Sequence, residues 1–153
     1  MLFTLLVVSL LANFTNHKLL LEKPAGLLGE NLPKDSPADR LKDYSIKIYD
    51  DKITVFVKNP YLAKFTDTHS MEPVLGSKST GIEIIPGSES DIKEGDIVSY
   101  AGSADEVIIH RVIKIGNDAE GWYAITKGDN NTGNDPGKIR FNQIKRILVG
   151  ILY

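Results

Sequence analysis

The residues of this chain best suited to chemistry are a serine, a histidine and two aspartates that lie far apart in the sequence. Ser70 stands in the stretch SMEP and His110 in IIHRVI, while Asp129 and Asp135 belong to the run TKGDNNTGNDPGK. A serine hydroxyl is a poor nucleophile unless a neighbouring base takes its proton and a third group orients that base. These residue types could form a hydrolytic Ser-His-Asp site if the fold brings them together.

The base must come from one of only three histidines. His17 lies in the N-terminal region, and His69 adjoins the serine, where adjacent side chains of an extended segment diverge. His110 lies in an alternating run and shares a strand face with Ile108 and Val112. A histidine in such a strand is more commonly packed and hydrogen-bonded than catalytic. From the residues alone, a structural histidine is therefore the favoured interpretation of His110, and a catalytic base is the alternative.

The composition excludes several other kinds of site. The chain has 153 residues, about one domain, and its 42% hydrophobic content is enough for a core. It has no cysteine, which excludes a disulfide framework, a Cys nucleophile and thiolate zinc sites. The net charge of −2, with scattered Lys and Arg, argues against a nucleic-acid partner. The acidic loop 126–138 is first of all a turn and does not match an EF-hand, so we expect no metal and no organic cofactor.

The elements that must position these side chains are short strands. Residues 44–59 alternate apolar and polar side chains around Asp50-Asp51, which predicts a hairpin. Further β-branched or aromatic runs separated by turn residues follow at 81–87, 95–100, 106–116, 121–128 and 144–153. No helical period is visible after residue 60. We expect a mainly β, compact antiparallel domain, barrel-like, over residues 44–153.

Residues 1–22 differ from this pattern because they begin with an almost unbroken apolar run, MLFTLLVVSLLANF. As a helix this run reaches about 20 Å, short of the roughly 30 Å hydrocarbon core, and polar residues interrupt its continuation. We expect an N-terminal apolar helix that anchors the chain in a membrane, with a cleavable signal peptide and a buried core helix as alternatives. Residues 23–43 form a connector, in which Ser36-Pro37 predicts the start of a short helix.

Taken together, the motifs resemble the signal peptidase I family, and more narrowly its archaeal and endoplasmic-reticulum branch, which uses histidine where the bacterial enzymes use lysine. The matching stretches follow the family's order and cover most of residues 66–153: SMEP at 70–73, GDIVSY at 95–100, IIHRVI at 108–113 and TKGDNN at 126–131. The resemblance implies the signal-peptidase catalytic fold. It also implies a serine endopeptidase that cleaves signal peptides from secretory preproteins after small residues.

The resemblance also implies a role for each matching residue. Ser70 would be the nucleophile, His110 the general base, and Asp135 the acid of the triad. Asp129 would support the site or share the duty of Asp135. The oxyanion hole would use the backbone N–H of Ser70 and the hydroxyl of Thr68.

The partners that follow from the resemblance are signal peptides of preproteins and a lipid membrane. The expected location is a membrane, with a single-pass chain and the catalytic domain on the extracytoplasmic side. Lys18 and Lys23, which follow the apolar run, would favour a cytoplasmic body, but Glu22 between them makes that bias weak. Whether partner subunits are required stays open.

Three departures from the family pattern are visible. His69 precedes the serine where the family usually has a small residue, often glycine, and Asn134 replaces an acid often found before Asp135. The link 76–96 between SMEP and the GD motif is also longer than usual. Two alternative functions remain: a self-cleaving, repressor-like serine peptidase, for which no helix-turn-helix precedes the β domain, and a catalytically silent β scaffold in a membrane assembly.

Overall fold

The computed structural model describes residues 35–103 and 106–153, and this part of the chain is mainly β, as expected. The apolar segment 1–22 and its expected helix lie outside the described residues. Within the two described stretches, no helix is long and apolar enough to cross a membrane. The strands are β1 (Ile46–Ile48), β2 (Ile53–Val55), β3 (Tyr61–Lys64), β4 (Thr80–Ile84), β5 (Ile97–Ala101), β6 (Val107–Asp118), β7 (Gly121–Lys127) and β8 (Ile144–Leu152). Short 3-10 turns are η1 (Asp43–Ser45), η2 (Glu89–Asp91) and η3 (Phe141–Gln143).

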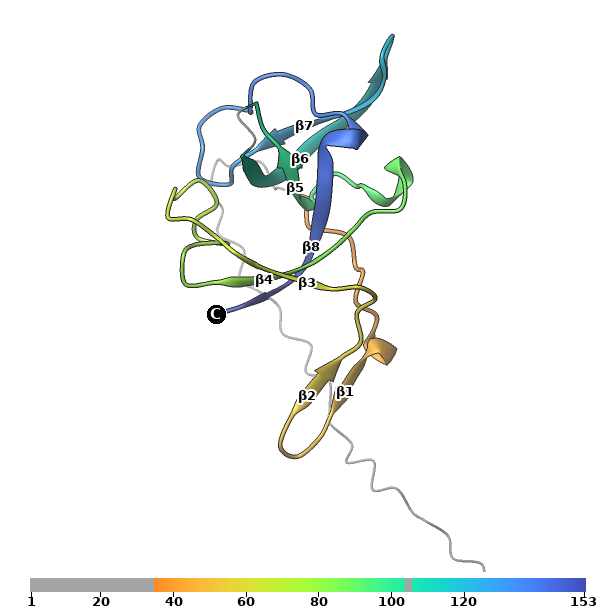
Figure 1. The fold of residues 1–153 in the computed structure, drawn as a ribbon, viewed down its shortest axis with the longest axis vertical. Helices are drawn as coiled ribbons and strands as arrows, with labels where there is room; N and C mark the ends of the chain where they lie inside the picture. Colours follow the sequence, from red (N-terminus) through yellow and green to blue (C-terminus); the bar gives the residue numbers. More distant parts are fainter. Residues whose placement is uncertain (1–34, 104–105) are drawn as a thin grey trace, which may run out of the picture. The chain divides into compact units, whose positions relative to one another are not determined.

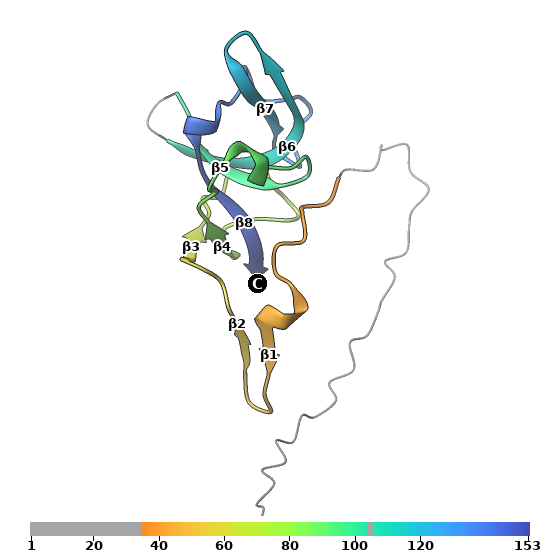
Figure 2. The same cartoon turned by 90° about the vertical axis from the view of Figure 1, so that its right-hand side faces the viewer.

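Six of these strands form one antiparallel sheet in the order β3-β4-β8-β5-β6-β7 (Figure 1). β8 joins the two halves of this sheet, because Ile147 lies opposite Val98 of β5 and Ile151 lies opposite Gly81 of β4. Figure 2 shows β8 running from the β5 region down to β4. The hydrogen-bonded order ends at β3 and β7, so within residues 35–103 and 106–153 the sheet does not close into the expected barrel.

The expected hairpin in 44–59 is confirmed. β1 and β2 pair antiparallel with Ile46 opposite Val55 and Ile48 opposite Ile53, and the chain turns at Asp50-Asp51. The side chains of both strands are exposed or half-buried. An isolated two-stranded hairpin is only marginally stable in water, so this element contributes little to the core.

The core consists of two apolar clusters, one on each face of β5 and β8. Consecutive residues of these strands belong to different clusters, because side chains alternate between the two faces of a strand. One cluster includes Val98, Ile147 and Trp122. The other includes Ile97 and Leu148 together with two residues of the serine-containing loop, Met71 and Leu75. Because Met71 is 3% exposed, the residue next to Ser70 is held in the core.

The expected helix start at Ser36-Pro37 is wrong, because residues 35–40 contain no helix. The backbone N–H of Ala38 donates to Oδ1 of Asp96 at 3.0 Å, and the Arg40 guanidinium pairs with the same carboxylate. Asp96 is fully buried. The connector is therefore held by a tertiary contact with Asp96 in place of a helix.

Candidate active site

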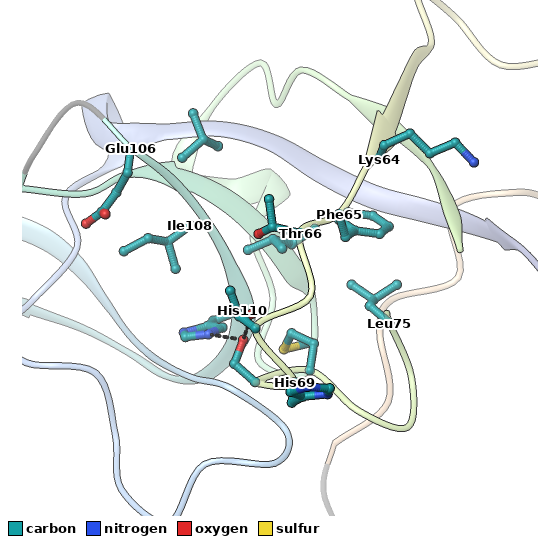
Figure 3. Close-up of a pocket in the computed structure, with 13 residues that line it drawn as sticks. Lys64, Phe65, Thr66, His69, Leu75, Glu106, Ile108 and His110 are labelled. Atoms are coloured by element: carbon teal, nitrogen blue, oxygen red, sulfur yellow. Dashed lines mark hydrogen bonds between the residues drawn. The ribbon is translucent and has the colours of Figure 1, made fainter. Parts of the chain in front are cut away.

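Three of the expected side chains form one hydrogen-bonded series. Nε2 of His110 lies 3.1 Å from Oγ of Ser70, a contact drawn as a dashed line in Figure 3. Nδ1 of the same ring lies 2.7 Å from Oδ2 of Asp135. A carboxylate accepts only if the imidazole proton sits on Nδ1, and Nε2 is then left to accept the serine proton. This is the arrangement that activates a serine hydroxyl.

Ser70 is positioned by a backbone of unusual conformation. The preceding residue, His69, has φ of +60°, in the left-handed region that glycine adopts most easily. This conformation gives a physical reason for the small residue that the resemblance leads one to expect here. His69 is exposed, and its Nδ1 lies 2.9 Å from Oε1 of Glu72. The hydrogen bond to Glu72, with the negative charges of Glu72 and Asp67, raises the pKa of His69.

The loop after β7 holds Ser70 through backbone contacts. The backbone N–H of Asn130 donates to the carbonyl of Ser70 at 2.9 Å, and its side-chain amide donates to the carbonyl of His69 at 3.1 Å. A Cβ atom on Gly128 would lie 2.6 Å from the Ser70 carbonyl oxygen. Glycine is therefore required at 128 for this close approach, which explains the first residue of the GDNN sequence.

Asp129 is not brought to His110. Its carboxylate instead accepts two hydrogen bonds from Arg111, at 2.8 Å from Nε and 2.7 Å from Nη2. Nη1 of Arg111 donates to the carbonyl of Gly95 at 2.7 Å. The side chains of Arg111 and Asp129 are 8% and 5% exposed, so this is a buried ion pair. The sequence reasoning gave Arg111 no role, although its place beside the candidate base on an alternating strand was a usable signal.

Asp135 has two further partners that the sequence reasoning missed. The hydroxyl groups of Tyr100 and Thr126 donate to Oδ2 of Asp135 at 2.8 Å and 2.7 Å. Burial raises the pKa of Asp135, but hydrogen bonds from Thr126, His110 and Tyr100 outweigh burial and hold the pKa below its usual value. The carboxylate is therefore ionised at neutral pH. Burial is also the main reason that the pKa of Tyr100 is raised, so its phenol keeps its proton.

Thr68, the expected second oxyanion donor, lies beside Ser70. Oγ1 of Thr68 is 3.1 Å from Oγ of Ser70. When the serine oxygen bonds to a carbonyl carbon, the carbonyl oxygen comes to lie within a few ångströms of that serine oxygen. The Thr68 hydroxyl is thus placed where it can donate to the developing negative charge.

Ser70 and His110 line a cleft of about 590 Å³. Figure 3 shows Phe65 and Thr66 along one side of this cleft and Glu106 and Ile108 along the other. The first side comes from the chain leaving β3 and the second from the start of β6. The lining comes from residues 64–71 without Asp67 on one side and from the unbroken run 106–110 on the other, with one further apolar residue: Lys64, Phe65, Thr66, Thr68, His69, Ser70, Met71, Leu75, Glu106, Val107, Ile108, Ile109 and His110.

One group of side chains near the cleft has the chemistry of a cation site. Asp67, His69 and Glu72 each offer one ligand atom, and these atoms lie within 4.8 Å of one another. All three residues are exposed. The hydrogen bond between His69 and Glu72 accounts for their arrangement without an ion, and the series through Ser70 does not include them.

The chain is similar in sequence to Signal peptidase I W of Bacillus subtilis (strain 168), with 28% identity over 93 residues. The alignment covers 59% of this chain and 47% of the relative, so the chain spans about half the length of the curated relative it matches. No family model matches the chain, and no solved structure matches it. The similarity supports a relationship to signal peptidase I at a coarse level and does not distinguish a subtype.

Proposed function

We propose that this chain is a membrane-associated serine endopeptidase that removes signal peptides from secretory preproteins. The observation that carries the proposal is the continuous hydrogen-bonded series from Ser70 through His110 to Asp135 at the cleft. The sequence similarity to a signal peptidase I supports the choice of substrate class. No cofactor is needed for this chemistry, because the alcohol, the base and the orienting acid all belong to the chain.

In the proposed reaction, Nε2 of His110 takes the proton of Ser70 as the serine oxygen bonds to the scissile carbonyl carbon. The backbone N–H of Ser70 and the hydroxyl of Thr68 stabilise the resulting oxyanion. The imidazolium then gives its proton to the leaving amine, and the carbon–nitrogen bond breaks to leave an acyl-enzyme. Water, deprotonated by the same imidazole, hydrolyses the ester and restores Ser70. Asp135 stays ionised throughout and holds the Nδ1 proton.

The substrate would bind as an added β-strand at the start of β6. The pairing of β7 with β6 begins at Arg111, so residues 107–110 are paired only with β5 among the described strands. Glu106 and Val112 make their backbone hydrogen bonds on the β5 side. Because backbone groups alternate sides along a strand, those of Val107 and Ile109 point to the opposite edge. This edge lies in the lining of the cleft and can pair with an extended peptide.

The walls of this cleft support the proposed specificity for small residues. Phe65 and Ile108 lie on opposite sides of it, so a peptide between them meets apolar side chains on both sides. In the proposal, the side chains at the −1 and −3 positions of the substrate enter shallow apolar pockets along these walls, which favour small residues.

The proposed location is a membrane, with the catalytic domain on the extracytoplasmic side, where the ends of signal peptides lie. Residues 1–22 would be the single membrane-spanning anchor in this proposal, because they contain the long apolar run of the sequence. The partners are then the preprotein and the lipid bilayer.

The proposal is tested by incubating the full chain with a preprotein embedded in lipid vesicles and reading the cut site by mass spectrometry. We expect one cut, after a small residue at the end of the signal peptide. The variant Ser70→Ala should not cut, whereas Ser77→Ala, which changes an exposed serine of the following turn, should cut as the unaltered chain does. Cleavage by Ser70→Ala at the unaltered rate would overturn the proposal. A chain that cuts no preprotein would leave the silent scaffold as the better interpretation.

A further inference from the structure

The carboxylate of Asp135 is held on a single oxygen by groups from three strands. Oδ2 lies 2.7 Å from Nδ1 of His110 on β6, 2.8 Å from the phenol oxygen of Tyr100 on β5, and 2.7 Å from Oγ1 of Thr126 on β7. Thr126 also fixes the backbone, because its carbonyl accepts the N–H of Asp135 at 2.8 Å. The loop aspartate is therefore positioned by the sheet and not by its own loop.

Tyr100 and Thr126 cannot reach a substrate. They are 2% and 1% exposed, and neither lines the cleft that contains Ser70. Their hydroxyl groups are polar atoms placed inside the protein, where an unpaired hydroxyl is costly. The Asp135 carboxylate satisfies both, so any effect of these two residues on chemistry must pass through Asp135.

We propose that Tyr100 and Thr126 are positioning residues of the peptidase, whose hydroxyl groups fix the Asp135 carboxylate and share its negative charge so that the His110 imidazolium is held firmly but can still release its proton. This inference rests on the proposed function. It gives a task to two residues of the GDIVSY and TKGDNN stretches that no role in the triad accounts for.

The two hydroxyl groups would matter because the proposed reaction needs a balance between two proton transfers. The imidazole must accept a proton from Ser70 and then give it to the leaving amine, so its proton must be neither too weakly nor too strongly held. A carboxylate with no other donors would concentrate its charge on the imidazolium and oppose the second transfer. Two neutral donors on the same oxygen weaken that attraction and also prevent the carboxylate from turning away.

Among the residues that the structure describes, few other charges act on the Asp135 carboxylate and the His110 ring. Glu106, at the start of the cleft wall, acts weakly on the Tyr100 phenol. Arg111 and Asp129 lie on the opposite face of β6 and compensate each other. The hydroxyl groups of Tyr100 and Thr126 are therefore the main neutral donors to the Asp135 carboxylate. Removing one of them should change how tightly the His110 ring holds its proton.

The test compares Tyr100→Phe and Thr126→Val, which remove one hydroxyl each, with Thr126→Ser, which keeps the hydroxyl and loses only a methyl group. We expect kcat to fall about tenfold in the first two variants, with KM unchanged, since neither residue lines the cleft. The acid limb of the kcat/KM profile should move to higher pH by about half a unit, because a less neutralised carboxylate retains the imidazolium longer. Thr126→Ser should keep both values close to those of the unaltered chain.

A second measurement separates this inference from the proposed function. The Nδ1 proton of His110 and its titration can be followed by NMR in the full chain with labelled histidine, whether or not any preprotein is cut. We expect the titration midpoint to rise in Tyr100→Phe and Thr126→Val and to stay in place in Thr126→Ser. Unchanged titration in both hydroxyl-deficient variants, with circular dichroism showing an intact fold, would overturn the inference. So would a Thr126→Ser variant that behaves like Thr126→Val.

Discussion

His110 and Arg111 are neighbours on β6, yet their side chains face opposite sides of the sheet and meet different aspartates. Each meets an aspartate of the same loop: His110 meets Asp135 at 2.7 Å, and Arg111 holds Asp129 through two hydrogen bonds. Both pairs are largely buried. The two faces thus carry pairs that are similar in geometry and differ in the chemistry of the basic side chain.

This difference separates proton transfer from positioning. An imidazole can gain and lose a proton near neutral pH, whereas a guanidinium stays charged. The Arg111–Asp129 pair joins β6 to Gly95 and to the loop whose backbone supports Ser70. In the proposed mechanism, the base is therefore the one of the two side chains that can lose its proton near neutral pH, and its charged neighbour holds the surrounding structure.

The largest effect should come from removing the proposed base. His110→Ala should lower kcat/KM for a preprotein by a factor of about 10⁴ to 10⁶, since the members of a triad act as a unit. Cleavage of a vesicle-embedded preprotein measures this loss, and near-ultraviolet circular dichroism checks that the fold persists. Activity close to that of the unaltered chain would remove His110 from the chemistry and end the contrast between the two faces.

The next test exchanges each aspartate for its neutral isostere. Asp135→Asn should lower kcat by about 10⁴, because the imidazole then presents the wrong tautomer, and should change stability little. Asp129→Asn leaves the Arg111 charge buried without its partner and should cost about 3–5 kcal/mol of unfolding free energy. Its loss of kcat should be smaller.

Urea denaturation and preprotein cleavage, measured on both variants, separate the two roles because each variant is the control for the other. If Asp129→Asn is the more damaging change to kcat and Asp135→Asn the more damaging to stability, the two aspartates have exchanged tasks.

The sequence was sufficient to place His110 and Arg111 on opposite faces of the strand. It was not sufficient to show which aspartate each of them would meet. Alternation along a strand places His110 and Arg111 on opposite sides, and this holds in the structure. Which aspartate goes to which face depends on the path of the loop after Lys127, which is set by contacts such as Gly128 against the Ser70 carbonyl. Local pattern contains no information about such a contact.

Other differences between expectation and structure have their own physical reasons. β3, Tyr61–Lys64, was missed because it has only four residues, follows a proline and is mostly exposed, so its sequence shows no period. Tyr100 was expected in a strand, but its hydrogen bond to Asp135 crosses from β5 to a loop beyond β7. The helix expected at Ser36-Pro37 is replaced by bonds to Asp96, a residue about sixty positions further along the chain. In the last two cases a contact with a distant residue, and not local propensity, decides the structure.

A smaller effect should follow from replacing Thr68, whose hydroxyl lies beside that of Ser70. Thr68→Val removes the hydroxyl that lies 3.1 Å from the Ser70 oxygen and should lower kcat about ten- to a hundredfold, with KM nearly unchanged. Thr68→Ser keeps the hydroxyl and should retain most of the activity. Equal activity in the valine and serine variants would show that the backbone N–H of Ser70 stabilises the oxyanion without this hydroxyl.

The smallest effect should come from replacing His69. Its carbonyl accepts a hydrogen bond from the side-chain amide of Asn130. A side chain at φ of +60° costs about 1 kcal/mol, which glycine avoids, although glycine loses more entropy on folding. The exposed contact of His69 with Glu72 adds little. His69→Gly should therefore keep stability within about 1 kcal/mol of the unaltered chain and kcat/KM within about threefold, whereas the β-branched His69→Val should lower both.

Thermal unfolding and preprotein cleavage of this pair isolate the backbone requirement from the imidazole, because both variants lack the ring and only one tolerates the conformation. If His69→Gly loses activity as strongly as His69→Val, the ring itself takes part in the site. The division of labour between the two faces of β6 would then be incomplete, because an exposed group on the loop, outside both buried pairs, would also be needed.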